Sequence, residues 1–339
     1  MREALTVFET EASRGRRGHG GAEIVAGDGF VAAAFRHRTS RAGDPHLHTH
    51  VVIANLVHGP DDRWTALDAR PLYHWSKTVG YLYEAELRHQ LATTLGVEWR
   101  AVRRGIADIT AVPMRVVDEF STRRHEIEAH MAANGGGSAR SAQLAAYATR
   151  RMKDHTATPE TLRDGWRQRA VDLGFDAELV CDQINADIDH PRDLGIVQLG
   201  PMFERLAGPD GLTRNRSIFG RRDVIQGICD LLPNGAPIAD IVERADLIVV
   251  QSTAFRSPAR VLRRSEPGTD GPSRPERTMP RYSTPDMLAA ARRLVVTALR
   301  RTGDGVGTAP EQRSPSSSSG SRRVSRTVSV NGLERASVT

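Results

Sequence analysis

A strand pattern is the clearest signal in the chain, and it begins at His48. On a strand, His48, His50 and Val52 would share one face, because successive side chains point to opposite faces. A second apolar run ends at His37, and turn-forming residues separate the two segments. The pattern predicts a hairpin or a neighbouring strand pair that brings His37 alongside His48 and His50.

Helical spacing of apolar residues predicts much of the remaining structure. A four-residue repeat ends before Gly96, a C-terminal stop signal, and predicts a helix with Tyr83 in the core and Tyr81 partly exposed. Glu86 and Arg88 on the same helix should belong to a solvated face. Further helices are predicted at 1–12, 115–133, 141–154, 159–173 and 217–232, and a flexible basic loop at 14–21.

The three histidines predict a site for a divalent metal ion. Neutral imidazoles of His37, His48 and His50 would leave coordination positions open for substrate or water, whereas a structural site is normally closed by a fourth ligand. Imidazole nitrogen suits manganese, cobalt, nickel or zinc, while magnesium and calcium prefer oxygen. The alternative is that these histidines are solvated or held by hydrogen bonds.

The histidine segment also carries a family resemblance. Residues 35–41 (FRHRTSR) followed by 44–50 (DPHLHTH) resemble the three-histidine motif of conjugative relaxases of the TrwC/TraI (MobF) type, which belong to the HUH endonucleases. Further blocks follow in the family's order at 64–68 (WTALD), 71–73 (PLY) and 83–88 (YEAELR). The resemblance implies an α+β fold, with an antiparallel sheet (the palm) and flanking helices, followed by a mainly helical extension.

The same resemblance assigns the metal ligands. It implies that His37, His48 and His50 bind a divalent ion of the manganese, magnesium, zinc or nickel class. His46 has the period of the ligand face, but Pro45 places it at the strand entrance. We therefore expect His46 to support the ligands rather than to bind the metal itself.

A reaction follows from the resemblance as well. In the family, a tyrosine hydroxyl attacks a phosphodiester of single-stranded DNA at a plasmid transfer origin and forms a 5′-phosphotyrosyl enzyme. The family's nucleophilic tyrosines precede the histidine block, whereas the first tyrosine here is Tyr73. We therefore expect an N-terminally truncated relaxase without a catalytic tyrosine, impaired in nicking and strand transfer, with Tyr73, Tyr81 and Tyr83 in structural roles. The alternatives are a non-enzymatic remnant that binds metal and DNA, and a product that does not fold.

A basic charge balance favours nucleic acid as the partner. The formal net charge is +6, and arginine supplies nearly all the positive charge, since Lys77 and Lys153 are the only lysines. A high-GC coding sequence would produce the same arginine bias. Trp64 and Trp75 could stack on bases, but core packing is the expected role. The expected DNA contacts are Arg36, Arg38 and Arg41 beside the histidines, and Arg123 and Arg124 on the helix that the resemblance makes part of a clamp over DNA.

Composition shifts along the chain predict its domain organisation. The predicted parts are a relaxase core lacking its tyrosine segment (1–155), a helical extension (156–256), a linker (257–280), the start of a truncated helicase region (281–309) and a disordered tail (310–339). ATP binding is not expected, because neither Lys77 nor Lys153 follows the glycines of a phosphate-binding loop.

The remaining features concern the compartment. Cys181 and Cys229 are the only cysteines and lie far apart, which fits a reducing cytoplasm. No apolar stretch is long enough for a membrane span, and the N-terminal residues do not resemble a secretory signal. We expect a cytoplasmic protein whose partners are single-stranded DNA at a transfer origin and other conjugation proteins, with no membrane segment.

Overall fold

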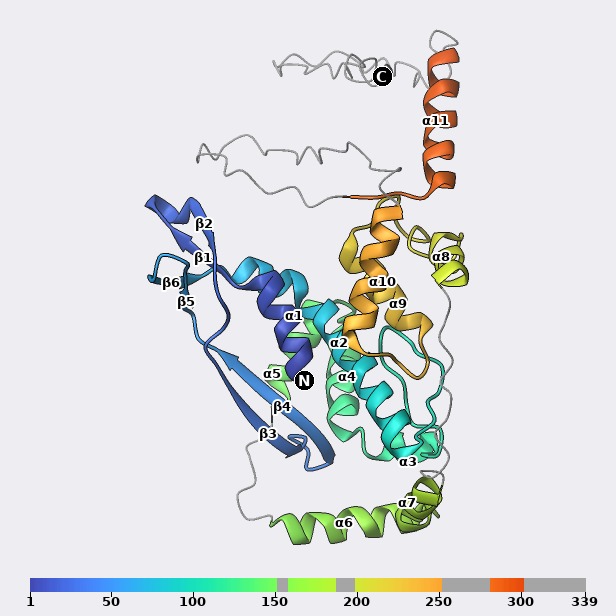
Figure 1. Ribbon diagram of the computed structural model, residues 1–339. Coiled ribbons are helices and arrows are strands. Elements are labelled where there is room, and N and C mark those ends of the chain that lie inside the picture. Colours follow the sequence, from blue (N-terminus) through green and yellow to red (C-terminus); the bar gives the residue numbers. More distant parts are fainter. Residues whose placement is uncertain (151–157, 187–198, 252–280, 302–339) are drawn as a thin grey trace, which may run out of the picture. The chain divides into compact units, whose positions relative to one another are not determined.

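The computed structural model describes residues 1–150, 158–186, 199–251 and 281–301 (Figure 1). By its internal contacts the chain divides into two compact units, Met1–Ala289 and Ala290–Thr339. The strands are β1 (Arg14–Arg17), β2 (Glu23–Ala26), β3 (Ala32–Thr39), β4 (Pro45–Ile53), β5 (Val57–His58) and β6 (Trp64–Leu67). The helices of the first half are α1 (Arg2–Ala12), η1 (His19–Gly21), α2 (Ala69–Leu95), α3 (Met114–Glu119), α4 (Thr122–Ala133) and α5 (Ala139–Ala148). Those that follow are α6 (Pro159–Asp172), α7 (Ala177–Ala186), α8 (Leu199–Ala207), α9 (Arg221–Leu231), α10 (Ile238–Gln251) and α11 (Pro285–Arg300).

All strand pairs of the described residues are antiparallel, and they form two sheets. One sheet has four strands in the order β2-β1-β6-β5, and the other is the two-stranded β3–β4 hairpin. Most side chains of the hairpin are exposed. Antiparallel strands with flanking helices confirm the predicted α+β class.

The expected basic loop at 14–21 is wrong for its first half, because residues 14–17 form strand β1. This strand pairs with β2 on one side and β6 on the other. The small residue Gly15 permits the close approach, since a Cβ atom there would lie 2.3 Å from Thr65 Oγ1. Arg17 fixes the strand end through two 2.6 Å hydrogen bonds to Asp61.

Helix α2 lies at the centre of the main hydrophobic core. It packs against α1, α9 and α10, so that buried residues from both ends of the described chain meet in one cluster. Trp75 is 2% exposed in this cluster, as expected for a core residue. The core thus joins elements from the predicted relaxase core and from the predicted helical extension, and the boundary between these two parts stays a prediction.

The prediction of a solvated face at Glu86 and Arg88 is wrong. Arg88 is fully buried and donates hydrogen bonds to the carbonyl oxygens of Gly105 (2.7 Å) and Cys229 (3.1 Å), among others. Glu86 accepts a 2.8 Å hydrogen bond from the backbone N–H of Ile238, at the start of α10. Both charges are buried because α9 and α10 cover this face of α2, and no local pattern around residue 88 signals that covering.

Tyr81 and Tyr83 of α2 exchange the environments predicted for them. Tyr81 is 8% exposed, whereas Tyr83 is 36% exposed. Gly105, with φ +82°, brings its backbone against the Tyr81 ring, where a Cβ atom would approach within 2.8 Å. The tertiary contact from residue 105 therefore buries Tyr81.

Several helix predictions are confirmed with changed ends. Helix α2 ends at Gly96 in the left-handed conformation, and α6 begins with Thr158 as cap and Pro159 at its first position. The single helix expected at 115–133 is two, α3 and α4. Helix α9 begins at Arg221, later than expected, because Asp223 accepts a 2.8 Å hydrogen bond from the Gly220 N–H and forms the cap there.

The linker predicted at 257–280 and the tail predicted at 310–339 lie outside the described residues. The segment predicted as the start of a helicase region contains α11, and its assignment stays a prediction. Within the described residues, none of the helices combines the length and the apolar character that crossing a bilayer demands.

Candidate metal centre and nucleic-acid interface

The β3–β4 hairpin brings His37, His48 and His50 together. His37 lies directly opposite His48 in the strand register, and His50 follows two residues later on the same face. One ring nitrogen of each histidine lies within 4.8 Å of those of the other two. The ring centroids are 4.8 to 5.3 Å apart. Three nitrogen donors that converge in this way match the ligand set of an open divalent site.

Hydrogen bonding fixes which nitrogen of His48 is available. His48 Nδ1 lies 2.8 Å from the carbonyl oxygen of His46, and since a carbonyl only accepts, Nδ1 carries the proton. The Nε2 lone pair of His48 therefore stays free for a metal ion. The His46 ring stacks on His48 with centroids 4.4 Å apart, and burial, with the nearby His48, lowers the pKa of His46. These contacts suit the supporting role expected for His46.

The histidines line a large cavity whose other walls are basic. Its volume is about 1010 Å³, and Arg36, Arg38 and Arg41 of the hairpin line it together with the histidines. Helix α5 supplies the lining residues Gln143 and Tyr147, and Arg150, two residues past its end, lines the cavity as well. The structure therefore places the three hairpin arginines, predicted as DNA contacts, at the candidate metal site.

The two arginines of α4 differ in what they contact. Arg123 lines the same cavity, but its guanidinium donates to the carbonyl oxygens of Ala146 (2.6 Å) and Thr149 (2.7 Å) and so caps the end of α5. Arg124 lines a neighbouring pocket and pairs with Glu128 at 2.7 Å. The core role expected for Trp64 is wrong, because this side chain is 58% exposed and lies beside His58, with ring centroids 5.0 Å apart.

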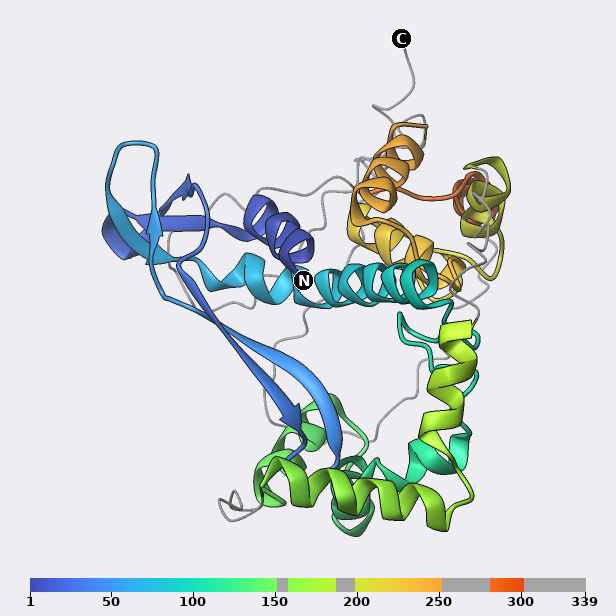
Figure 2. The ribbon, with the colours of Figure 1, turned by 60° about the horizontal axis from the view of Figure 1, so that its bottom comes forward.

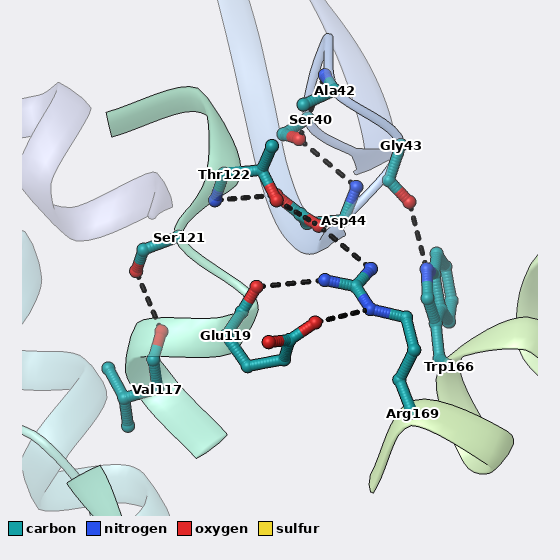
Figure 3. A network of polar contacts seen from close by, with 10 residues as sticks. All are labelled: Ser40, Ala42, Gly43, Asp44, Val117, Glu119, Ser121, Thr122, Trp166 and Arg169. Carbon is teal, nitrogen blue, oxygen red and sulfur yellow. Dashed lines mark hydrogen bonds and ion pairs between the residues drawn. The ribbon is translucent and has the colours of Figure 1, made fainter. Parts of the chain in front are cut away.

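A buried carboxylate fastens the turn of the hairpin to the helices (Figure 3). Asp44 is 1% exposed, and its carboxylate accepts hydrogen bonds from the backbone N–H and the hydroxyl of Thr122, each at 3.1 Å. Arg169 of α6 donates to the same carboxylate at 3.1 Å and to Glu119 Oε1 at 2.9 Å. The N–H of Thr122 is the first of α4, so Asp44 caps this helix from a distant part of the chain.

A further hydrogen bond attaches the turn of the hairpin to α6. The indole N–H of Trp166 donates to the carbonyl oxygen of Gly43 at 2.8 Å, and Gly43 takes the left-handed φ of +86°. Figure 2 shows the turn of the blue hairpin reaching the green helices of this region. Sequence reasoning missed Asp44, Trp166 and Arg169, because an aspartate before a proline indicates only a turn and its partners lie about 80 to 125 residues away.

This arrangement suits one kind of chemistry. The three imidazoles on two paired strands are nitrogen donors that could together hold a cation, and the arginines around them place positive charge in the same cavity. Fold and site are thus an antiparallel sheet with flanking helices that carries a three-histidine cluster in an arginine-lined cavity.

Comparison with known proteins identifies the family. The model of the TrwC relaxase family matches residues 1–173 of the 339, just over half of the chain. The chain therefore belongs to the TrwC relaxase family, which confirms the resemblance drawn from the histidine motif.

Individual relatives match over part of their length. The multifunctional conjugation protein TraI of Escherichia coli is 31% identical over 261 residues, which cover 71% of this chain and 14% of the relative. TraI of strain K12 is 30% identical over 262 residues with the same coverage. The chain thus spans about a seventh of the length of these relatives. A solved structure of conjugative relaxase TrwC with oriT DNA, metal-bound, is 32% identical with a TM-score of 0.47, covering 51% of this chain and 61% of that one.

Proposed function

We propose that this chain provides the metal site and the strand-binding cavity of a conjugative relaxase, which nicks and rejoins single-stranded DNA at a plasmid transfer origin. The observation that carries the proposal is the convergence of His37, His48 and His50 in a cavity lined by arginines. Relatives named for conjugation and for complexes with oriT DNA support the substrate class.

The histidines and the arginines of the cavity have different proposed roles, because their side chains differ in chemistry. His37, His48 and His50 would hold a divalent ion, and when bound such an ion supplies positive charge to a non-bridging phosphate oxygen. Arg38 and Arg41 provide further charge for the phosphates that flank it. The 2.8 Å contact with the His46 carbonyl orients the His48 ring so that it presents Nε2.

The second candidate function is a module that binds metal and DNA without cleaving the strand. Of the described tyrosines, Tyr147 alone lines the cavity, and Tyr73, Tyr81 and Tyr83 belong to α2. We propose that neither Tyr147 nor the α2 tyrosines act as the nucleophile, so that this chain by itself binds a single strand and leaves it intact.

One experiment tests both candidates. Metal content is measured for the parent and for His48→Ala, with His46→Ala as matched control from the same strand, and each is incubated with single-stranded oligonucleotides. We expect His48→Ala to lose most of the bound metal and His46→Ala to keep it, because the latter is not a ligand. Equal metal content in all three would refute the ligand assignment.

The same samples, run on a denaturing gel, report covalent protein–DNA adducts. An adduct in the parent would show that a tyrosine of this chain is nucleophilic and would refute the binding-only candidate. Bound metal and bound DNA without an adduct would support it.

A further inference from the structure

One face of α5 presents two side chains toward the cavity of the histidine site. Gln143 and Tyr147 are four residues apart on this helix, so they share one helical face, and Arg150, two residues past the helix end, lines the same cavity. Ala145 of the same helix is 1% exposed and packs inward. This packing turns the opposite face, with the Gln143 amide and the Tyr147 ring, outward.

Tyr147 is the unusual member of this face. It is 68% exposed, and among the described residues no ring stacks on it and no group hydrogen-bonds to its hydroxyl. Tyr81, by comparison, is 8% exposed in the core. A single exposed aromatic is common on protein surfaces, but this one lies in a basic cavity that also contains three imidazoles.

Both ends of α5 are fixed, which holds in place the backbone that carries Tyr147. Ser138 and Ser141 form a reciprocal capping box at the start of the helix. Arg123 binds the carbonyl oxygens of Ala146 and Thr149 on either side of Tyr147 along the chain. An aromatic ring on such a fixed helix loses little conformational freedom when it stacks on a ligand.

We propose that Tyr147 stacks on a base of a single strand whose phosphates lie along the histidine site, with Arg150 on the adjoining phosphate. The inference rests on the proposed function and adds a strand-positioning residue to it. An unpaired base offers a free face to the ring, whereas bases in a duplex are stacked on each other, so this contact favours single strands and accepts any base.

Binding of a fluorescein-labelled single-stranded oligonucleotide, followed by anisotropy, tests the proposal on the full chain. Tyr147→Ala should raise the Kd about 5- to 150-fold, which is the range for loss of one stacked base. Tyr147→Phe should bind like the parent, because the ring is kept. Tyr73→Ala is the matched control, since Tyr73 is 83% exposed on α2 and does not line the cavity.

A second readout follows the stack itself. An oligonucleotide with 2-aminopurine at successive positions should show strong quenching at one of them with the parent and with Tyr147→Phe, and none with Tyr147→Ala. Equal Kd values for the parent and Tyr147→Ala would overturn the inference while leaving the proposed function intact. Equal weakening by Phe and Ala would also overturn it, since the hydroxyl would then be the active group. A parent that binds no single strand would overturn both.

Discussion

Replacement of Asp44 by asparagine removes the charge that fastens the hairpin to α4 and α6. The carboxylate makes three hydrogen bonds, two to Thr122 and one to Arg169, and its side chain is 2% exposed. Loss of a charge-assisted bond costs about 1.5–3 kcal/mol, and loss of a helix cap costs about 1 kcal/mol. Arg169 is 34% exposed and keeps its bonds to Glu119, which reduces the loss. We expect a decrease of about 2 kcal/mol in the free energy of opening this region.

Native-state hydrogen exchange is the suitable assay, because it detects local opening of the hairpin and α4 separately from global unfolding. The Thr122 amide should exchange roughly 30-fold faster in Asp44→Asn than in the parent, which is the factor for about 2 kcal/mol. Asp118→Asn is the control, since Asp118 is 75% exposed and bonds to His125 at 2.9 Å. Its effect should stay below about 0.5 kcal/mol. Equal protection of Thr122 in the two variants would refute the reasoning.

Two further predictions concern the core and the outer sheet. Arg88→Leu should lower the free energy of unfolding, measured by urea denaturation, by about 2–4 kcal/mol, because buried carbonyl oxygens lose their donor. The control Arg167→Leu, at an arginine side chain that is 68% exposed, should change this free energy little. Hydrogen bonds to Asp28 and Asp62 raise the pKa of His58. The stability that this gives is therefore complete below pH 6.5 and is lost as the pH rises through the raised pKa. NMR titration of the imidazole should show a pKa above 6.5 that falls in Asp28→Asn; an unchanged value would contradict the assigned cause.

Local sequence patterns correctly predicted those elements whose ends or faces are marked by neighbouring residues. The hairpin follows from strand alternation and turn residues, α6 from Thr158 and Pro159, and the end of α2 from Gly96. The three-histidine cluster belongs to the same group, because strand period and register together place three imidazoles on one face.

Such local patterns did not predict the contacts between segments that are distant along the chain. A charged residue at helical spacing indicates a solvated face unless something covers it, and Arg88 is covered by segments about 140 residues further along the chain. Tyr147 gave no signal either, since its relevance depends on α5 lying beside the histidine cavity.

The sequence alone determined the strand pair, the three-histidine set and the membership of the relaxase family, because these depend on residues close to one another along the chain. The tertiary structure alone decided that Arg88 is buried, that Asp44 attaches the hairpin to the helices and that Tyr147 is the tyrosine, among those described, that lines the histidine cavity. The physical reason is that burial and pairing at these positions depend on surfaces contributed by distant segments, and a local pattern contains no information about which surface will cover it.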